Sequence, residues 1–354
     1  MPREIPTNTP LRRTPADYCP AGSARWFRVD DGPDRGKTLF YYDVAPAGDP
    51  AGTVLFVHGN PECSYTWRHV RDALIASGAP LRLIAPDHIG FGLSDQASFE
   101  MVEMHHAANL ARLVRELDLR DVTLVLHDWG GPTGVGAFLD QPERVSAVMV
   151  VNSTVFPMPA DGYTYTNYPV WWFPWCRTPK VVPDALWGGV ASYVVSHGEP
   201  QSTLRLLAGV GVHAFRHALG LFPQGSPESV WSGQFRSRAN ARSSQRYVLQ
   251  TPVWGHGYRY RDPVLGDQDN HDLYRRMQEM VPREWGRQGR DIPAAGQFGA
   301  WDACGKESVI RQWQQALPTM HDRTRVYPEH GHFLEEHRGV EIADDILALN
   351  GSAR

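Results

Sequence analysis

Four apolar runs, separated by stretches with helical spacing, constrain the fold of this chain more than any other feature. The runs cover residues 53–58, 81–86, 121–127 and 144–152 and are rich in valine, leucine and isoleucine. A strand has this composition when both of its faces are buried, as in a parallel sheet covered by helices. The alternation therefore predicts an α/β fold built on a doubly wound, mostly parallel sheet.

The segments around these runs complete the pattern. Helical spacing predicts helices at 66–77 and 103–119, and a third helix from Pro132, because proline suits a first helical turn. Upstream, 24–30 and 37–44 flank the turn sequence DGPDRG and predict a hairpin. The rhythm returns near the C-terminus, with predicted strands at 292–298 and 324–329 and predicted helices near 306–316 and 333–349.

A long segment interrupts this rhythm. Residues 154–290 are rich in Trp, Tyr, Pro and Gly, and only scattered helical pieces are predicted there, for example at 200–220 and 269–280. We expect a mainly helical insertion into the sheet domain. The predicted organisation is an N-terminal arm at 1–23, expected to be loose, a first core part at 24–153, the insertion at 154–290 and a second core part at 291–354.

Composition excludes several classes of protein. A net charge of -4 with mixed signs gives no reason to expect a nucleic-acid partner. No apolar run approaches 18 residues, and the polar, proline-rich start lacks a secretory signal, so we expect no membrane span. The 4 cysteines form no CxxC pair, which favours free thiols in the cytoplasm and no metal. No cofactor is expected, and the chain is expected to be a monomer or small homo-oligomer.

Side chains capable of chemistry follow the ends of predicted strands. Asn60 follows the first apolar run, and Asp128 and Trp129 follow the third. Asp302 and His332 come after the last two predicted strands. In such sheets ligands bind beyond the carboxyl ends of the strands, so we expect these five residues to converge. The order of nucleophile candidate, acid and histidine is that of α/β-hydrolase triads.

Four stretches together resemble the haloalkane dehalogenase and epoxide hydrolase branch of the α/β-hydrolase fold: HGNPECSYTWRHV, APDHIGFGLSD, LVLHDWGGP and HGHFLEE. The resemblance covers about residues 24–153 and 290–349. It is weak across the insertion, which would be the cap domain and is longer than the family usually carries.

The resemblance assigns roles to the converging residues. A carboxylate at position 128 is already anionic at neutral pH, with an ordinary pKa of about 3.9, and can displace a leaving group from carbon directly. The resulting ester of Asp128 is expected to be hydrolysed by water that His332 activates, while Asp302 orients the imidazole. The backbone N–H groups of Asn60 and Trp129 are expected to stabilise the oxyanion.

The leaving group decides the substrate class. The Trp129 indole and the Asn60 amide are hydrogen-bond donors and would cradle a halide, and this Asn–Trp pair is the halide-binding pair of the dehalogenases that the chain resembles. We therefore predict hydrolysis of a small apolar haloalkane to an alcohol and a halide through a covalent aspartyl ester.

Three alternatives stay open. Pro61 and Glu62 resemble the epoxide-hydrolase version of their loop. Asp302, the Asn–Trp pair and DHIGFGLSD also resemble the subgroup that includes β-lactone decarboxylases. A non-catalytic binding protein of the same fold is the third alternative, although such relatives often lack a triad member. Tyrosines of the insertion could converge over Asp128 and protonate an epoxide oxygen: Tyr163, Tyr165, Tyr168, Tyr193, Tyr247 and Tyr258.

Overall fold

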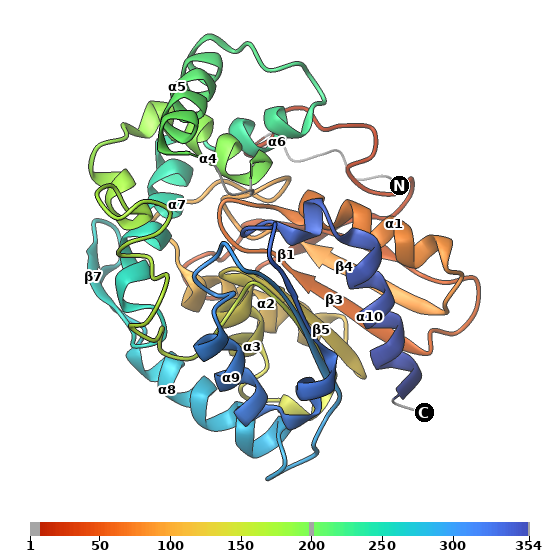
Figure 1. The fold of residues 1–354 in the computed structure, drawn as a ribbon. Coiled ribbons are helices and arrows are strands. Elements are labelled where there is room, and N and C mark those ends of the chain that lie inside the picture. Colours follow the sequence, from red (N-terminus) through yellow and green to blue (C-terminus); the bar gives the residue numbers. More distant parts are fainter. Residues whose placement is uncertain (1–7, 198–201, 353–354) are drawn as a thin grey trace.

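An eight-stranded sheet organises the computed structural model, which describes residues 8–197 and 202–352 (Figure 1). The strand order is β1-β2-β4-β3-β5-β6-β9-β10; β2 runs antiparallel to both neighbours, and the strands from β4 to β10 are parallel. The predicted doubly wound, mostly parallel sheet is therefore confirmed. The strands are β1 (Ala24–Arg28), β2 (Thr38–Val44), β3 (Gly52–Val57), β4 (Leu81–Pro86), β5 (Val122–His127), β6 (Val145–Val151), β9 (Ala294–Gly299) and β10 (Thr324–Tyr327).

Helices cover both faces of this sheet. On one face α1 (Arg68–Ala76) and α10 (Gly339–Ser352) pack side by side, and on the other face α2 (Glu103–Glu116) packs on α3 (Gly130–Ala137) (Figure 1). Between the last two strands lies α9 (Glu307–Ala316). All of these helices were predicted, although two of them begin elsewhere.

The two shifted helix starts both concern the site. The third helix begins at Gly130 rather than Pro132, because the turn after β5 continues directly into helical hydrogen bonds. The last helix begins at Gly339 rather than near 333. The residues before it form a loop with a short 3-10 turn at Leu334–Glu336, and this loop carries His332.

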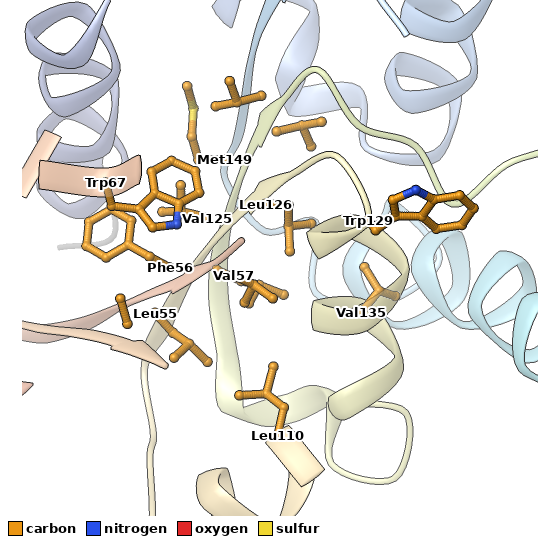
Figure 2. Close-up of a cluster of buried hydrophobic side chains, with 14 of the residues drawn as sticks. Leu55, Phe56, Val57, Trp67, Leu110, Val125, Leu126, Trp129, Val135 and Met149 are labelled. Carbon is orange, nitrogen blue, oxygen red and sulfur yellow. The ribbon is translucent and has the colours of Figure 1, made fainter. Parts of the chain in front are cut away.

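The centre of the core lies around β3 and β5. Every residue of both strands is buried. Phe56 packs against Trp67, and aliphatic side chains such as Val57 and Leu126 fill the space toward α3 (Figure 2). Burial of each such side chain contributes roughly 1.5–3 kcal/mol. The ends of β3 and β5 are therefore firmly held, and the loops that follow them start from fixed points.

Between β6 and β9 the chain forms the predicted, mainly helical insertion. It also contains a short hairpin that the sequence analysis missed, because its strands carry mostly charged and polar residues and few β-branched ones. The elements are α4 (Trp187–Ser196), α5 (Thr203–Leu219), α6 (Pro227–Gly233), α7 (Arg238–Gln250), β7 (Arg259–Asp262), β8 (Gly266–Asp269) and α8 (His271–Met280).

The N-terminal arm is packed rather than loose where the structure describes it. Residues 8–23 contain no helix or strand, yet Leu11 and Tyr18 are buried. The Tyr18 hydroxyl donates to Asp87 Oδ2 at 2.7 Å, and its ring stacks on Tyr65. The expectation of a loose arm is wrong for these residues, because two apolar side chains anchor it to the sheet domain; residues 1–7 lie outside the described part.

Glycines after β5 allow α3 to approach the sheet closely. A Cβ atom on Gly130 would lie 2.0 Å from the carbonyl oxygen of Val57, and one on Gly134 would lie 2.4 Å from Leu126 Cδ2. Only a residue without a side chain fits at Gly130, because the obstacle there is backbone, whereas at Gly134 the Leu126 side chain would have to move. The start of α3 is thereby pressed against the ends of β3 and β5.

This packing predicts a strong position dependence of glycine substitutions. Gly130→Ala should lower the free energy of unfolding by about 1–3 kcal/mol, because the new methyl group overlaps a backbone oxygen. Gly211→Ala in α5 is the matched control: its Cβ meets nothing within 4 Å, so better helix propensity should raise stability by up to about 1 kcal/mol. Urea midpoints measure both effects, and an unchanged midpoint for Gly130→Ala would contradict the close packing.

Candidate active site

Asp128 occupies the sharp turn between β5 and α3. Its φ of 48° lies in the left-handed region, which non-glycine residues rarely adopt and which costs roughly 1–2 kcal/mol. Its backbone oxygen accepts hydrogen bonds from Ser153 Oγ at 2.5 Å and from the Gly131 N–H at 3.1 Å. These contacts hold the turn, which places the carboxylate at the carboxyl edge of the sheet.

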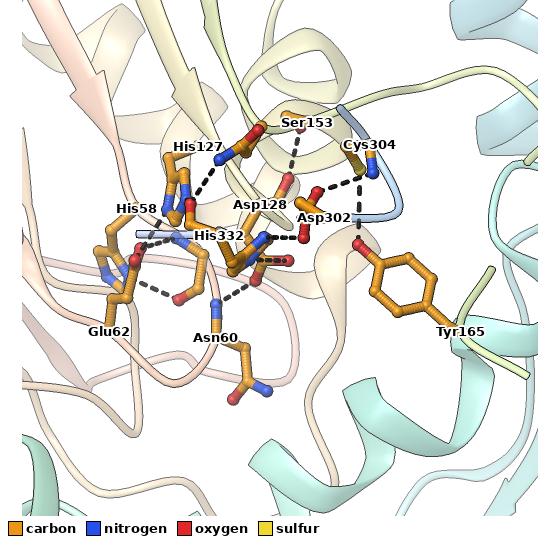
Figure 3. A network of polar contacts seen from close by, with 12 residues as sticks. His58, Asn60, Glu62, His127, Asp128, Ser153, Tyr165, Asp302, Cys304 and His332 are labelled. Carbon is orange, nitrogen blue, oxygen red and sulfur yellow. Dashed lines mark hydrogen bonds and ion pairs between the residues drawn. The ribbon is translucent and has the colours of Figure 1, made fainter. Parts of the chain in front are cut away.

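The predicted residues meet around this carboxylate (Figure 3). The backbone N–H of Asn60 donates to Asp128 Oδ2 at 2.7 Å, and His332 Nε2 lies 3.2 Å from Asp128 Oδ1. On the other side of the imidazole, His332 Nδ1 lies 2.8 Å from Asp302 Oδ2. Asp302 is fully buried, and its second oxygen accepts from the Cys304 N–H at 2.7 Å. Asp128, His332 and Asp302 thus form one continuous chain of polar contacts.

The charge on His332 follows from its two neighbours. Burial alone would lower the pKa of the imidazole, but the carboxylates of Asp302 and Asp128 raise that pKa well above its ordinary value. The two carboxylates therefore favour the protonated form of the ring. Removal of either negative charge would make the proton on His332 easier to lose.

Asn60 contributes its backbone to Asp128 and its side chain to the insertion. Ser244 Oγ accepts from Trp187 Nε1 at 2.8 Å, so its own hydrogen is donated to Asn60 Oδ1. Asn60 Nδ2 donates in turn to the backbone oxygen of Ser244 at 3.3 Å. This arrangement fixes the orientation of the amide and leaves it one N–H. In Figure 3 the amide extends away from Asp128.

Trp129 opens α3 and lines the pocket above the carboxylate. Its ring is buried, stacks on Trp254 with ring centroids 3.9 Å apart, and contacts Tyr247 at 5.0 Å. Among the described residues its indole N–H has no hydrogen-bond acceptor. The structure therefore places both predicted donors, Asn60 and Trp129, at the pocket.

A small, partly open pocket lies above Asp128, with a cavity volume of about 60 Å³. Its floor contains Asp128 and His332, and the insertion supplies much of its wall, which is mostly apolar and aromatic. Three of the six candidate tyrosines line it: Tyr165, Tyr168 and Tyr193.

The tyrosine hydroxyls were one of the two sequence features that favoured an epoxide, together with Pro61 and Glu62. Burial raises the pKa of Tyr165 and Tyr168 well above the ordinary value, so both hydroxyls keep their protons. The Tyr165 hydroxyl lies 3.4 Å from Cys304 Sγ (Figure 3). That contact directs it toward the Asp302 loop.

A buried cluster of ionisable groups behind His332 was not predicted. His127 Nδ1 lies 2.7 Å from Glu62 Oε1, and His127 Nε2 lies 3.5 Å from Glu335 Oε2; none of the three side chains is exposed. His127 Nε2 also lies 2.9 Å from the backbone oxygen of His332, and the two rings are 4.8 Å apart (Figure 3). The cluster thus touches the loop that carries the candidate base.

The charges in this cluster compensate one another. Burial would lower the pKa of His127, but Glu335 and Glu62 raise it to about 9. Burial raises the pKa of Glu335, which therefore keeps a proton that the two carboxylates can share. One ligand atom from each residue lies within 4.8 Å of the others, so the group has the spacing of a metal site.

A sequence signal for this cluster did exist. Each member stands close to a predicted site residue: Glu62 shortly after Asn60, His127 directly before Asp128, and Glu335 shortly after His332. Proximity along the chain does not show that three separate loops turn these side chains toward one another, so the cluster emerged only from the structure.

Comparisons with known proteins support the fold. Residues 52–178 match the family described as alpha/beta hydrolase fold. Two proteins named cis-3-alkyl-4-alkyloxetan-2-one decarboxylase are similar: that of Xanthomonas campestris is 34% identical over 135 residues, 36% of this chain and 43% of that protein. The one of Shewanella oneidensis is 26% identical over 333 residues, 88% of this chain and 84% of that protein.

Two dehalogenases are also similar. The haloalkane dehalogenase of Mycolicibacterium smegmatis is 36% identical over 147 residues, 40% of this chain and 45% of that protein. The chain thus spans less than half the length of two of these three relatives. The solved structure of a tetrameric haloalkane dehalogenase from Paraglaciecola agarilytica superimposes with a TM-score of 0.63 at 22% identity, covering 95% of this chain and 97% of that one. The sheet order and these similarities show that the chain has the α/β-hydrolase fold, and the proteins it resembles include haloalkane dehalogenases and oxetanone decarboxylases.

Proposed function

We propose that this chain is a hydrolase that cleaves carbon–halogen bonds of apolar alkanes through a covalent ester on Asp128. One observation carries the proposal: His332 Nε2 stands 3.2 Å from Asp128 Oδ1 and Nδ1 stands 2.8 Å from Asp302, while the Asn60 N–H holds Asp128 Oδ2. A nucleophile, a base and an orienting acid in contact are what a two-step displacement requires.

The first step is a displacement at carbon. Because Asp128 Oδ2 accepts the Asn60 N–H, Oδ1 is the oxygen that bonds to the substrate carbon. The carbon–halogen bond breaks as the carbon–oxygen bond forms, and the halide leaves as an anion. The Trp129 indole and the remaining N–H of Asn60 are the donors that would receive it. The apolar walls of the pocket keep water from competing for these donors.

The second step uses the change in charge that the first step produces. An ester at Asp128 has no negative charge, so one of the two groups that raise the pKa of His332 disappears. The imidazole then loses its proton more easily and can accept one from water. The resulting hydroxide adds to Cγ of the ester, and the Asn60 N–H stabilises the oxyanion on Oδ2. Collapse releases the alcohol and restores the carboxylate.

A β-lactone is the second candidate substrate, and the similarity to the Shewanella decarboxylase over 333 residues favours it. Asp128 Oδ1 would bond to the saturated ring carbon that is attached to the ring oxygen. The bond between that carbon and the ring oxygen breaks, and the opened ring carries a free carboxylate. Loss of carbon dioxide then forms a carbon–carbon double bond and expels the Asp128 carboxylate. This route consumes no water and needs no base, which distinguishes it from the halide route.

The buried cluster supports the halide route by fixing the loop of the base. His127 Nε2 contacts the backbone oxygen of His332, and Asn152 Nδ2 donates to the same oxygen at 2.7 Å. Glu335 is anchored in turn by the Thr66 hydroxyl at 2.7 Å. These contacts hold the imidazole between its two carboxylates before substrate arrives.

Replacing His332 with Gln should trap the ester. With a bromoalkane, the variant should release about one bromide per protein molecule, because displacement survives and hydrolysis does not. Mass spectrometry of the peptide that carries Asp128 should show the added alkyl group. The double variant that also carries Asp128→Asn is the control and should show neither bromide nor adduct. Normal turnover by the His332→Gln variant would show that His332 is not the base.

Trp129→Phe should separate the substrate classes. Loss of the indole N–H should lower kcat/KM for bromide release by roughly 10–100-fold, the usual effect of removing a donor to a charged group. Lactone decarboxylation, in which no halide leaves, should fall much less. Bromide release, lactone decarboxylation and epoxide opening are assayed side by side on both proteins. Equal losses for all three substrates would contradict the halide role of Trp129.

The cluster predicts a loss of stability at alkaline pH. His127 and Glu335 both have raised pKa values in the folded state, so the folded protein binds more protons than the unfolded chain. The His127 contribution, on the order of 3 kcal/mol, should be complete below its ordinary pKa and lost as pH rises through about 9. Urea unfolding across this range measures it. Glu335→Gln should make the decline shallower; an identical decline would show that the cluster does not titrate.

A further inference from the structure

Helix α5 of the insertion turns its apolar side toward solvent. Its two histidines face inward, and Gly209 of the same helix packs against Tyr193 of α4. Leu204 and Phe215 are 81% and 61% exposed. A surface helix ordinarily shows the opposite arrangement, with its apolar stripe toward the core. We call the outward apolar residues, with one tryptophan beside them, the α5 face: Trp171, Leu204, Leu207, Val212, Phe215 and Leu219.

The tryptophan extends this surface beyond the helix. Trp171 is 79% exposed and lines a shallow hollow together with Thr203, the first residue of α5. The face therefore runs from this loop along the 17 residues of α5, about 25 Å of helix. A continuous exposed apolar surface of this kind marks an interaction site.

The charges around the α5 face are basic. Arg205 and Arg216 project from α5, which contains no acidic residue. Near its C-terminal end, a groove is lined by Arg12, Arg13 and Arg236 and by no carboxylate. Within the described ranges, no carboxylate forms an ion pair with any of these five arginines. The surface is therefore suited to an anionic partner.

The pocket above Asp128 extends to the inner side of the same helix. Leu206, on the inner side of α5, lines the pocket together with Val194 of α4. Pro169 lines both the pocket and the hollow beneath Trp171. Whatever covers the α5 face is therefore separated from the pocket by this helix and by Pro169.

We propose that the α5 face docks on a lipid bilayer that contains anionic headgroups, with α5 lying in the plane of the interface. Apolar residues flanked by arginines, with tryptophan at the edge, match the way amphipathic helices bind such surfaces. Among residues 8–197 and 202–352 no helix combines the length and apolar character of a membrane span, so attachment is peripheral. A symmetric contact with a second copy would bring the two sets of arginines together, which disfavours that occupant.

Docking does not rest on the proposed function, because the α5 face is separate from the pocket. The two are therefore tested by separate measurements, lipid binding and turnover.

Vesicle flotation with the full chain tests the docking. The protein should float with vesicles of phosphatidylcholine and phosphatidylglycerol more than with phosphatidylcholine alone, and added salt should weaken the binding. Leu204→Ser with Phe215→Ser should lower partition at least tenfold. Val264→Ser with Val340→Ser is the matched control, because these valines are 66% and 61% exposed elsewhere on the surface, and it should bind like the parent protein. Arg205→Gln with Arg216→Gln should abolish the preference for anionic vesicles.

Three outcomes would overturn the proposal. One is failure of the parent protein to float with anionic vesicles. Another is equal binding by the α5-face variant and the valine control. The third is that the parent protein and the valine control are dimers without lipid while the α5-face variant is a monomer. That result would assign the α5 face to a contact with a second copy. Two controls show that the α5-face variant is folded. Its circular dichroism spectrum and its turnover of a short, water-soluble bromoalkane should equal those of the parent protein.

Discussion

The ion network of Asp128, His332 and Asp302 requires the surrounding structure to hold three buried ionisable side chains at fixed distances. Two carboxylates on either side of one imidazole are stable in a buried site only if every distance is held, because an unpaired buried charge is costly. The left-handed turn at Asp128 provides one fixed point, and the fully buried β5 before it keeps that point still. The glycines after it let α3 lock the turn against β3.

The same network gives its two carboxylates different surroundings. Asp302 is fully buried and takes its hydrogen bonds from His332 and a backbone N–H. Asp128 faces the pocket, and the Asn60 N–H holds one of its two oxygens. In the mechanism that we propose, esterification cancels the charge of Asp128 alone, which lowers the pKa of His332 when hydrolysis needs a base.

Much of this arrangement could be predicted from the sequence, for a simple reason. Asp128, Asp302 and His332 follow strands of a parallel sheet, and carboxyl ends of parallel strands share one edge, so strand recognition alone brings the residues together. The two helices whose starts were wrong follow Asp128 and His332. The first begins earlier than predicted, at Gly130, because the turn at Asp128 continues into helical hydrogen bonds. The second begins later, at Gly339, because the loop that carries His332 and a 3-10 turn comes before it.

Contacts between distant segments could not be predicted. The Asn60 amide is oriented by Ser244 on α7, and the Glu62–His127–Glu335 cluster joins three loops. The outward apolar stripe of α5 was part of a correctly predicted helix, but periodicity does not tell which side of a helix meets the core. The N-terminal arm likewise lacks any periodic signal, although Tyr18 anchors it on Asp87.

Heavy-oxygen water tests the central claim most directly. In a single turnover of a bromoalkane in labelled water, the alcohol should carry unlabelled oxygen, because that oxygen comes from Asp128. The label should appear in the Asp128 carboxylate and reach the product only in later turnovers. Label that enters the alcohol in the first turnover and never the protein would contradict the covalent ester.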